Sequence, residues 1–190
     1  PVAVKLIHPH LLEHDEIRER FEREARAAAK LQSEHVARVL DVDVLEDGVP
    51  YIVLEYLEGR SLEDVLSEDG RLPIETAADY LVQALDAVVE AHARGIVHRD
   101  LKPANLFVAR RFGKPDIVKV LDFGIAKEIG QTSAHATATH AVLGSPGYMS
   151  PEQVGSSKEV DARSDIWSLG IILYELLAGQ EPFGGETIGE

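Results

Sequence analysis

The strongest constraint on the fold of this chain is a pair of polar clusters, each placed beside a short apolar run. Residues 98–105 read His-Arg-Asp-Leu-Lys-Pro-Ala-Asn, with the apolar residues 96–97 before them and 106–108 after them. Residues 122–124 read Asp-Phe-Gly and follow the largely apolar residues 117–121. Short apolar runs bounded by turn residues are typical of buried strands. Both clusters are therefore predicted to lie on turns that neighbouring strands hold in place.

Four side chains of these clusters suit phosphoryl transfer. Asp100 can accept the proton of a hydroxyl group, and Lys102 can approach the phosphoryl group that moves. Asn105 and Asp122 offer the hard oxygen ligands that Mg²⁺ prefers. Taken singly, the Asp-Phe-Gly string fits an ordinary turn and the His-Arg-Asp string fits a salt bridge at a helix end. Together they predict Mg-dependent phosphoryl transfer from ATP, a reaction that depends on positioning and neutralised charge.

Residues 15–31 are predicted to form an amphipathic helix rich in Ala, Glu and Arg. Its apolar positions lie on one stripe: Ile17, Phe21, Ala28 and Leu31. Glu24 lies on the same stripe, and a carboxylate on a buried face is unfavourable unless a cation meets it. Lys5 is the natural candidate for that cation. The alternative is a glutamate tolerated at a loosely packed edge of the core.

Two further helices are predicted. Pro73 suits the first turn of a helix, and the apolar positions after it form a stripe that ends near Gly95: Ile74, Ala77, Ala78, Leu81, Leu85, Val88 and Val89. Residues 164–177, with Gly179 beyond their end, are apolar on almost all sides and are predicted to form a central buried helix. Asp165 lies near the start of this helix, where the dipole favours a carboxylate.

Together these motifs resemble the catalytic core of protein kinases. Lys102 two residues after Asp100, with Gly-Ser-Pro at residues 144–146, is similar to the serine/threonine branch. Small-molecule kinases that share the fold are the nearest alternative, but they lack the Ser-Pro-Glu of residues 150–152. Three strings resemble the eukaryotic-like (Hanks-type) serine/threonine protein kinases of bacteria: residues 105–108, 119–127 and 149–153.

The resemblance implies a two-lobed α+β fold that is truncated at both ends. Residues 1–54 would form part of a small lobe without its glycine-rich loop, and residues 55–59 would form the hinge. Residues 60–190 would form part of a mainly helical large lobe without its last helices. The chain is thus expected to be a catalytic-core fragment with little activity in isolation.

The resemblance also assigns roles to particular residues. ATP and Mg²⁺ are the implied cofactors, Asp100 is the implied catalytic base, and Lys102, Asn105 and Asp122 complete the catalytic set, the last two as metal ligands. The implied nucleotide site draws on both lobes: Lys5 and Glu24 for the phosphates, Ala3 and Phe107 around the adenine ring, and the backbone of Glu55 and Leu57 at the hinge beside the gatekeeper Leu54. Asp165 would hold the backbone of the catalytic turn, a role that can coexist with the dipole role.

Residues 125–151 are poor in large apolar residues and rich in Gly, Ser, Thr and Ala, and they resemble the activation segment of kinases. The implied regulatory residues are Arg99, Thr137, Thr139 and Ser145. Ser145 stands where Thr is usual in the family and keeps the hydroxyl group. The two threonines match positions where similar bacterial kinases autophosphorylate, and the arginine would receive the phosphate. The alternative is an unregulated loop whose threonines are only solvated.

Composition narrows the classes of partner. The net charge of −14 argues against nucleic acid and anionic membrane surfaces. No apolar run reaches the roughly 18 residues of a membrane span and no signal peptide is visible, so these residues are expected to be cytoplasmic, with any membrane anchor of the full-length protein outside them. The expected partners are ATP and protein substrates with Ser or Thr acceptors, with dimerisation serving autophosphorylation. The lack of cysteine excludes disulfides and thiolate metal sites.

The rival from another functional class is a pseudokinase or scaffold that binds partners without catalysis. A scaffold has no need of a complete catalytic set. This chain keeps five polar residues of that set: Lys5, Glu24, Asp100, Asn105 and Asp122. The intact set favours the enzyme.

Overall fold

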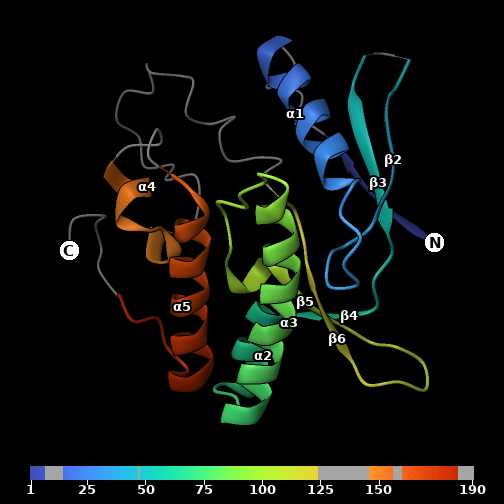
Figure 1. Ribbon diagram of the computed structural model, residues 1–190. Coiled ribbons are helices and arrows are strands. Elements are labelled where there is room, and N and C mark those ends of the chain that lie inside the picture. Colours follow the sequence, from blue (N-terminus) through green and yellow to red (C-terminus); the bar gives the residue numbers. More distant parts are fainter. Residues whose placement is uncertain (7–14, 47, 124–145, 156–159, 184–190) are drawn as a thin grey trace.

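A computed structural model describes residues 1–6, 15–46, 48–123, 146–155 and 160–183, with the backbone alone for residues 15–18, 20 and 146. A small sheet with one helix lies to one side, and a mainly helical part lies to the other (Figure 1). The two parts join where strand β3 (Pro50–Glu55) leads into strand β4 (Gly59–Ser61). This arrangement confirms the predicted α+β class with two lobes.

The small sheet is antiparallel, with the strand order β1-β3-β2, where β1 is Val2–Leu6 and β2 is Val39–Val44. Helix α1 (Asp15–Ala28) packs on it through a small core of Phe21, Ala25 and Ile52. The prediction that this helix reaches Leu31 is wrong, because tighter turns follow Ala28: the Lys30 and Leu31 N–H groups donate to carbonyls only three residues back, at 3.1 and 3.0 Å. Leu31 is nevertheless buried.

The second sheet has the order β4-β5-β6 and is also antiparallel, with β5 at Leu106–Ala109 and β6 at Ile117–Val120. Leu106 pairs with Val120, so the start of β5 and the end of β6 lie at the same edge. The two polar clusters are therefore neighbours, as the predicted turns require. Residues 96–97 form no strand, because the Ile96 N–H still donates to Ala91 O at 2.9 Å at the end of the preceding helix.

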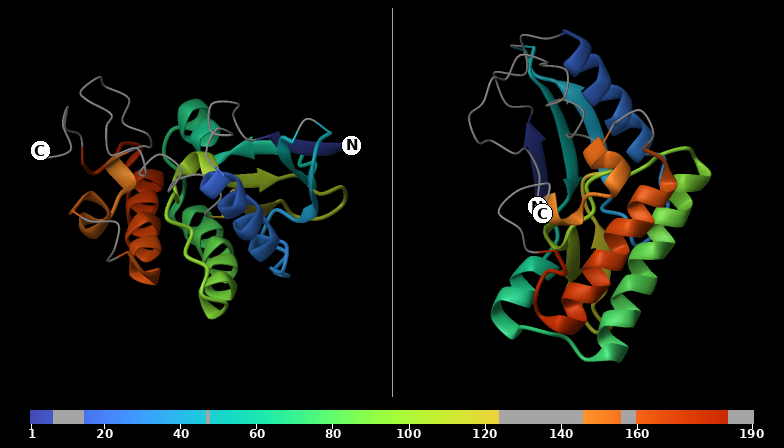
Figure 2. Two further views of the ribbon diagram at one scale, coloured as in Figure 1. Left: turned by 90° about the horizontal axis from the view of Figure 1, so that it is seen from above. Right: turned by 90° about the vertical axis from the view of Figure 1, so that its left-hand side faces the viewer.

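Helices α2 (Leu62–Asp69), α3 (Ile74–Ala93), α4 (Pro151–Gly155) and α5 (Ala162–Ala178) build the other part, and α3 and α5 lie side by side (Figures 1 and 2). The predicted stripe of α3 is partly wrong: Ala78 is exposed, and Ile74 and Val89 are 70% and 62% exposed. The buried face is instead rich in alanine: Ala77, Leu81, Ala84, Ala87, Val88 and Ala91. Small side chains let the helix approach α5 and β6 closely.

Helix α5 begins two residues earlier than predicted. Its N-cap is Asp161, whose carboxylate accepts the Arg163 N–H at 2.9 Å. It ends at Ala178 and is capped by Gly179, whose left-handed φ of 75° suits glycine and whose N–H donates to Glu175 O at 2.7 Å. The helix is apolar on most sides, but only part of it is buried among the described residues: Ser164, Asp165, Ser168, Leu169, Ile171, Ile172 and Leu176.

Candidate active site

The turn at residues 98–100 is held by one buried carboxylate. Asp165, at the first turn of α5, is 1% exposed and accepts the His98 N–H at Oδ2 and the Arg99 N–H at Oδ1, both at 2.8 Å. His92 of α3 donates to Oδ2 as well, at 2.7 Å. Arg99 has a φ of 65°, a left-handed conformation that a non-glycine residue adopts only when its surroundings enforce it. Asp165 thus does what the resemblance implied, and it does so from the N-terminal turn of the helix.

His98 connects the two polar clusters. Its side chain is completely buried, and Nε2 donates to Leu121 O at 2.8 Å while Nδ1 accepts the Asp100 N–H at 3.3 Å. The ring also packs on Phe123, with centroids 4.9 Å apart. Burial lowers the pKa of His98. The neutral ring with its proton on Nε2 satisfies both hydrogen bonds, so the imidazole joins residues 98–100 to the chain that leads into Asp122.

The structure brings Asp100, Lys102 and Asn105 together. Asn105 Nδ2 donates to Asp100 O at 2.8 Å and to Asp100 Oδ2 at 3.3 Å, and Lys102 Nζ lies 3.3 Å from the same Oδ2. Asn105 closes a short 3₁₀ turn, Pro103–Asn105, and its carbonyl accepts the Leu121 N–H at 2.9 Å. The Asp100 carboxylate is therefore held beside a cation and an amide, with part of its side chain open to solvent.

Asp122 lies opposite the small sheet and has a left-handed φ of 57°. Its Oδ1 is 2.7 Å from Lys5 Nζ of β1. A carboxylate two residues beyond β6 and a cation from the first sheet therefore meet at one place. Glu24 is half-buried on the face of α1 that also carries Phe21 and Ala25. The Lys5–Glu24 pair stays a prediction.

The predicted adenine residues lie along the junction of the two sheets. Ala3 pairs with Leu54 in the β1–β3 register, and Glu55 ends β3, with Leu57 just beyond it. Phe107 lies on β5, directly opposite Lys119 of β6. The Glu55 N–H donates to Arg38 O at 3.0 Å.

Residues 148–153 are fastened to both the catalytic turn and α5. Gln153 Nε2 donates to Arg99 O at 2.8 Å, and Ser168 Oγ donates to Tyr148 O at 2.8 Å. Tyr148 Oη donates to Glu175 Oε2 at 2.6 Å, and burial together with this carboxylate raises the pKa of Tyr148. Burial also raises the pKa of Glu175. The segment next to the catalytic turn is thus fixed by side chains of α5.

Several predicted residues lie outside the described part of the chain: Gly124, Thr137, Thr139 and Ser145. The sequence reasoning missed His92 and Gln153, which contact the catalytic turn or its anchor. The first left a signal, because His92 falls four residues after the buried Val88, where a polar group needs a partner. Gln153 left no such signal, because a glutamine on a short helix without buried residues does not indicate a contact.

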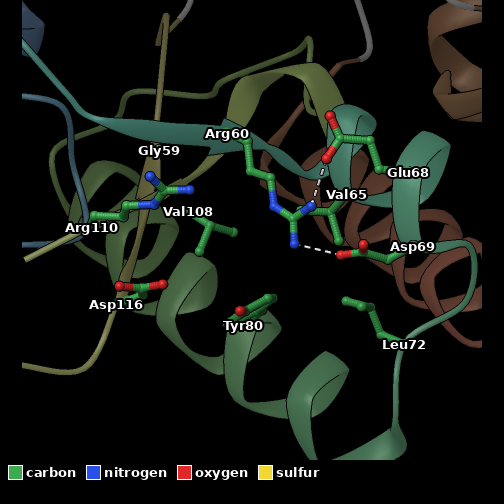
Figure 3. Close-up of a pocket in the computed structure, with 10 residues that line it drawn as sticks. All are labelled: Gly59, Arg60, Val65, Glu68, Asp69, Leu72, Tyr80, Val108, Arg110 and Asp116. Atoms are coloured by element: carbon green, nitrogen blue, oxygen red, sulfur yellow. Dashed lines mark hydrogen bonds and ion pairs between the residues drawn. The ribbon is translucent and has the colours of Figure 1, made fainter.

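A cavity of about 360 Å³ lies elsewhere, between β4, α2, α3 and β5 (Figure 3). Arg60 crosses one side of it and pairs with Glu68 at 2.8 Å and with Asp69. Tyr80, Arg110 and Asp116 line other parts of its wall. No predicted catalytic or nucleotide residue lines this cavity.

The described residues contain neither a membrane-spanning helix nor a cluster of metal ligands. Among the described helices, none is both long and apolar enough to cross a lipid bilayer. The same residues contain no group of three or more His, Asp or Glu side chains arranged to hold a metal ion.

Comparisons with known proteins agree with this geometry. The family model described as "Protein kinase domain" matches residues 1–190. The chain is 42% identical over 189 residues to the probable serine/threonine-protein kinase PknB of Corynebacterium glutamicum, covering 98% of this chain and 28% of that protein. It is 44% identical over 189 residues to the serine/threonine-protein kinase Pkn1 of Myxococcus xanthus, covering 98% and 26%.

The fold is similar to that of a solved kinase domain. The crystal structure of the Mycobacterium tuberculosis PknI kinase domain matches with a TM-score of 0.74 and 26% identity, covering 99% of this chain and 70% of that one. The chain spans roughly a quarter to a third of the length of the curated relatives it matches, between 26% and 34%.

Proposed function

The chain belongs to the protein kinase domain family, and we propose that its centre transfers the γ-phosphoryl group of ATP to Ser or Thr hydroxyl groups of proteins. One observation carries the proposal: the Asp100 carboxylate lies 3.3 Å from both Lys102 Nζ and Asn105 Nδ2. A carboxylate held in this way can accept the proton of a hydroxyl group. The names of the relatives support the choice of Ser and Thr.

The donor atoms fit Mg²⁺. Because Asn105 Nδ2 is used by Asp100, the amide oxygen is the atom left for a metal, and Asp122 supplies carboxylate oxygens nearby in the chain. The remaining ligands would come from phosphate oxygens and water. When bound, the metal neutralises phosphate charge. Asn105 and Asp122 would hold it, and Lys5 brings a further cation to Asp122.

The other chain residues orient the reactants. Lys102, beside the base, would meet the phosphoryl group as it moves. The backbone of Glu55 and Leu57 would bind the adenine edge, with Ala3 and Phe107 on its two faces. Lys5 and Glu24 would orient the phosphates together. Phosphorylation of Thr137 or Thr139 would regulate the centre, with Arg99 binding the phosphate. The proposed partners are proteins with Ser or Thr acceptors and a second copy of the kinase for autophosphorylation.

The test is phosphate transfer by the full-length gene product with radiolabelled ATP, Mg²⁺ and a generic basic protein. Asp100→Asn should lower the rate by about 10² to 10⁴ while nucleotide still binds, because it removes the base and keeps the size of the side chain. Asp116→Asn, in the turn between β5 and β6, is the matched control and should behave as wild type. Equal rates for Asp100→Asn and wild type would refute the assignment of the base, and a wild type that binds nucleotide without transfer would favour the scaffold.

A further inference from the structure

A carboxylate at the hinge and a lysine of β6 meet between the two sheets. Lys119 Nζ lies 2.6 Å from Glu55 Oε1 and also donates to Val36 O at 3.2 Å. Both side chains are largely shielded from solvent, with 14% of Lys119 and 28% of Glu55 exposed. Lys119 is a charged residue within a strand whose other three residues are buried. A shielded, charge-assisted hydrogen bond keeps its geometry better than an exposed ion pair does.

Glu55 is held on more than one side. Its Oε1 also accepts the Arg38 N–H at 2.8 Å, and its own N–H donates to Arg38 O at 3.0 Å. Residues 35–38, which include Arg38, are also bonded to β6 through the backbone: the Val120 N–H donates to His35 O at 2.7 Å, and the Ala37 N–H donates to Val120 O at 3.0 Å. The hinge, residues 35–38 and β6 are thus one hydrogen-bonded unit.

Lys119 also borders the proposed adenine site. Phe107 and Lys119 are direct partners in the antiparallel β5–β6 register, so their side chains lie on the same face of that sheet. Asp122 follows Lys119 by three residues along the same segment. One lysine therefore lies beside the proposed floor of the adenine site, bonds to the hinge and sits on the strand that carries the proposed metal ligand.

We propose that the Glu55–Lys119 pair is a positioning device for nucleotide, fixing the hinge backbone relative to Asp122 so that both ends of one ATP are met together. The inference rests on the proposed function and adds a residue that the family comparison did not assign. Lys119 acts through Glu55 and touches no reacting atom. Because a preformed site loses less freedom on binding, the pair should strengthen nucleotide binding more than it changes the chemical step.

The test compares Lys119→Met, Glu55→Gln and the double variant in the full-length gene product. Methionine keeps much of the lysine stem without its charge, and glutamine keeps an oxygen for the Arg38 N–H. Each single variant should raise the Kd of a fluorescent ATP analogue and the KM for ATP about fivefold to tenfold, the loss expected for one net hydrogen bond. The kcat should stay within about twofold, since the chemical groups are untouched.

The double variant should bind no more weakly than Lys119→Met alone, because Glu55→Gln weakens the same charge-assisted bond that Lys119→Met removes. Lys119→Arg restores a cation and should recover most of the affinity. Arg60→Met, which removes the ion pairs to Glu68 and Asp69 on neighbouring β4, is the matched control and should bind nucleotide as wild type does.

Nucleotide binding separates this inference from the proposed function. A wild type that transfers no phosphate overturns the function, whatever the variants bind. An unchanged Kd in Lys119→Met, or additive losses in the double variant, overturns the positioning role alone. If Lys119→Met fails to fold by thermal unfolding, the Glu55→Gln and Lys119→Arg variants decide by the same Kd measurement.

Discussion

Replacing Asp165 by asparagine should release the catalytic turn. The wild-type carboxylate uses both oxygens on the backbone of that turn, at 2.8 Å to the His98 N–H and 2.8 Å to the Arg99 N–H, and also accepts a hydrogen bond from His92. Asparagine has the same shape but only one oxygen, so its amide group must face a donor. The substitution thus leaves at least one buried N–H without an acceptor.

The size of the effect follows from these contacts. A buried donor that loses its acceptor costs about 1–3 kcal/mol, and relaxation of the left-handed backbone at Arg99, which the Asp165 bond helps to enforce, offsets part of this cost. Asp165→Asn should therefore lower the free energy of unfolding by about 1–3 kcal/mol, a sizeable share of the 5–15 kcal/mol typical of a domain. If the turn shifts by about 1 Å, kcat should fall about 10²-fold.

Urea unfolding and phosphate transfer of the full-length gene product measure the two effects. Asp161→Asn is the matched control, because Asp161 caps the same helix α5 with an exposed carboxylate that bonds to Arg163 N. It should lose less stability and keep its kcat. If Asp165→Asn is as stable and as active as Asp161→Asn, then the dipole role alone accounts for the residue, and the anchoring argument is wrong.

Three further predictions follow from other residues. Lys5→Met and Glu24→Gln should each lower turnover, and the double variant should lose much less than the sum if the two side chains form the predicted pair; simple additivity in that cycle counts against it. Mass spectrometry after incubation with ATP and Mg²⁺ should find phosphate at Thr137 or Thr139, and a double alanine variant should be less active. Absence of phosphate at both threonines, or full activity of the double variant, would refute the switch. Because burial lowers the pKa of His98, the unfolded chain takes up its proton first, so stability should fall as pH drops below about 6.5, and a His98→Gln variant should show a flatter urea-unfolding profile between pH 5 and 8.

The parts of the fold that could be predicted are those in which local pattern and burial agree. The apolar runs before Asp122 and after Asn105 became β6 and β5, because each is short and surrounded by turn residues. Gly179 ended α5 where its left-handed conformation requires glycine. The site residues Asp100, Lys102 and Asn105 were brought together because they share one turn.

The wrong predictions concern the face of α3 and the end of α1. The face of α3 was misjudged in part: the predicted stripe included the exposed Ile74, Ala78 and Val89 and left out the buried Ala84, Ala87 and Ala91. Close helix packing instead selects the small residues, and which neighbour comes close is a property of the tertiary fold. The end of α1 was misjudged because Leu31 fits both a helix stripe and the buried turn that follows it.

The contacts that matter most for function join residues far apart in the chain, which no local pattern reveals. Asp165 and His98 lie 67 residues apart, and Lys119 and Glu55 lie 64 apart. In each case a charged or polar side chain occupies a shielded place, and burial without a partner would destabilise the fold. The sequence therefore indicates that a buried aspartate at a helix start, or a lysine inside an apolar strand, has a partner. Only the fold identifies that partner. In the structure, the partners of Asp165 are backbone N–H groups of the catalytic turn, and the partner of Lys119 is Glu55 at the hinge. The hydrogen bonds that compensate for the burial of these side chains therefore also set the geometry of the proposed site.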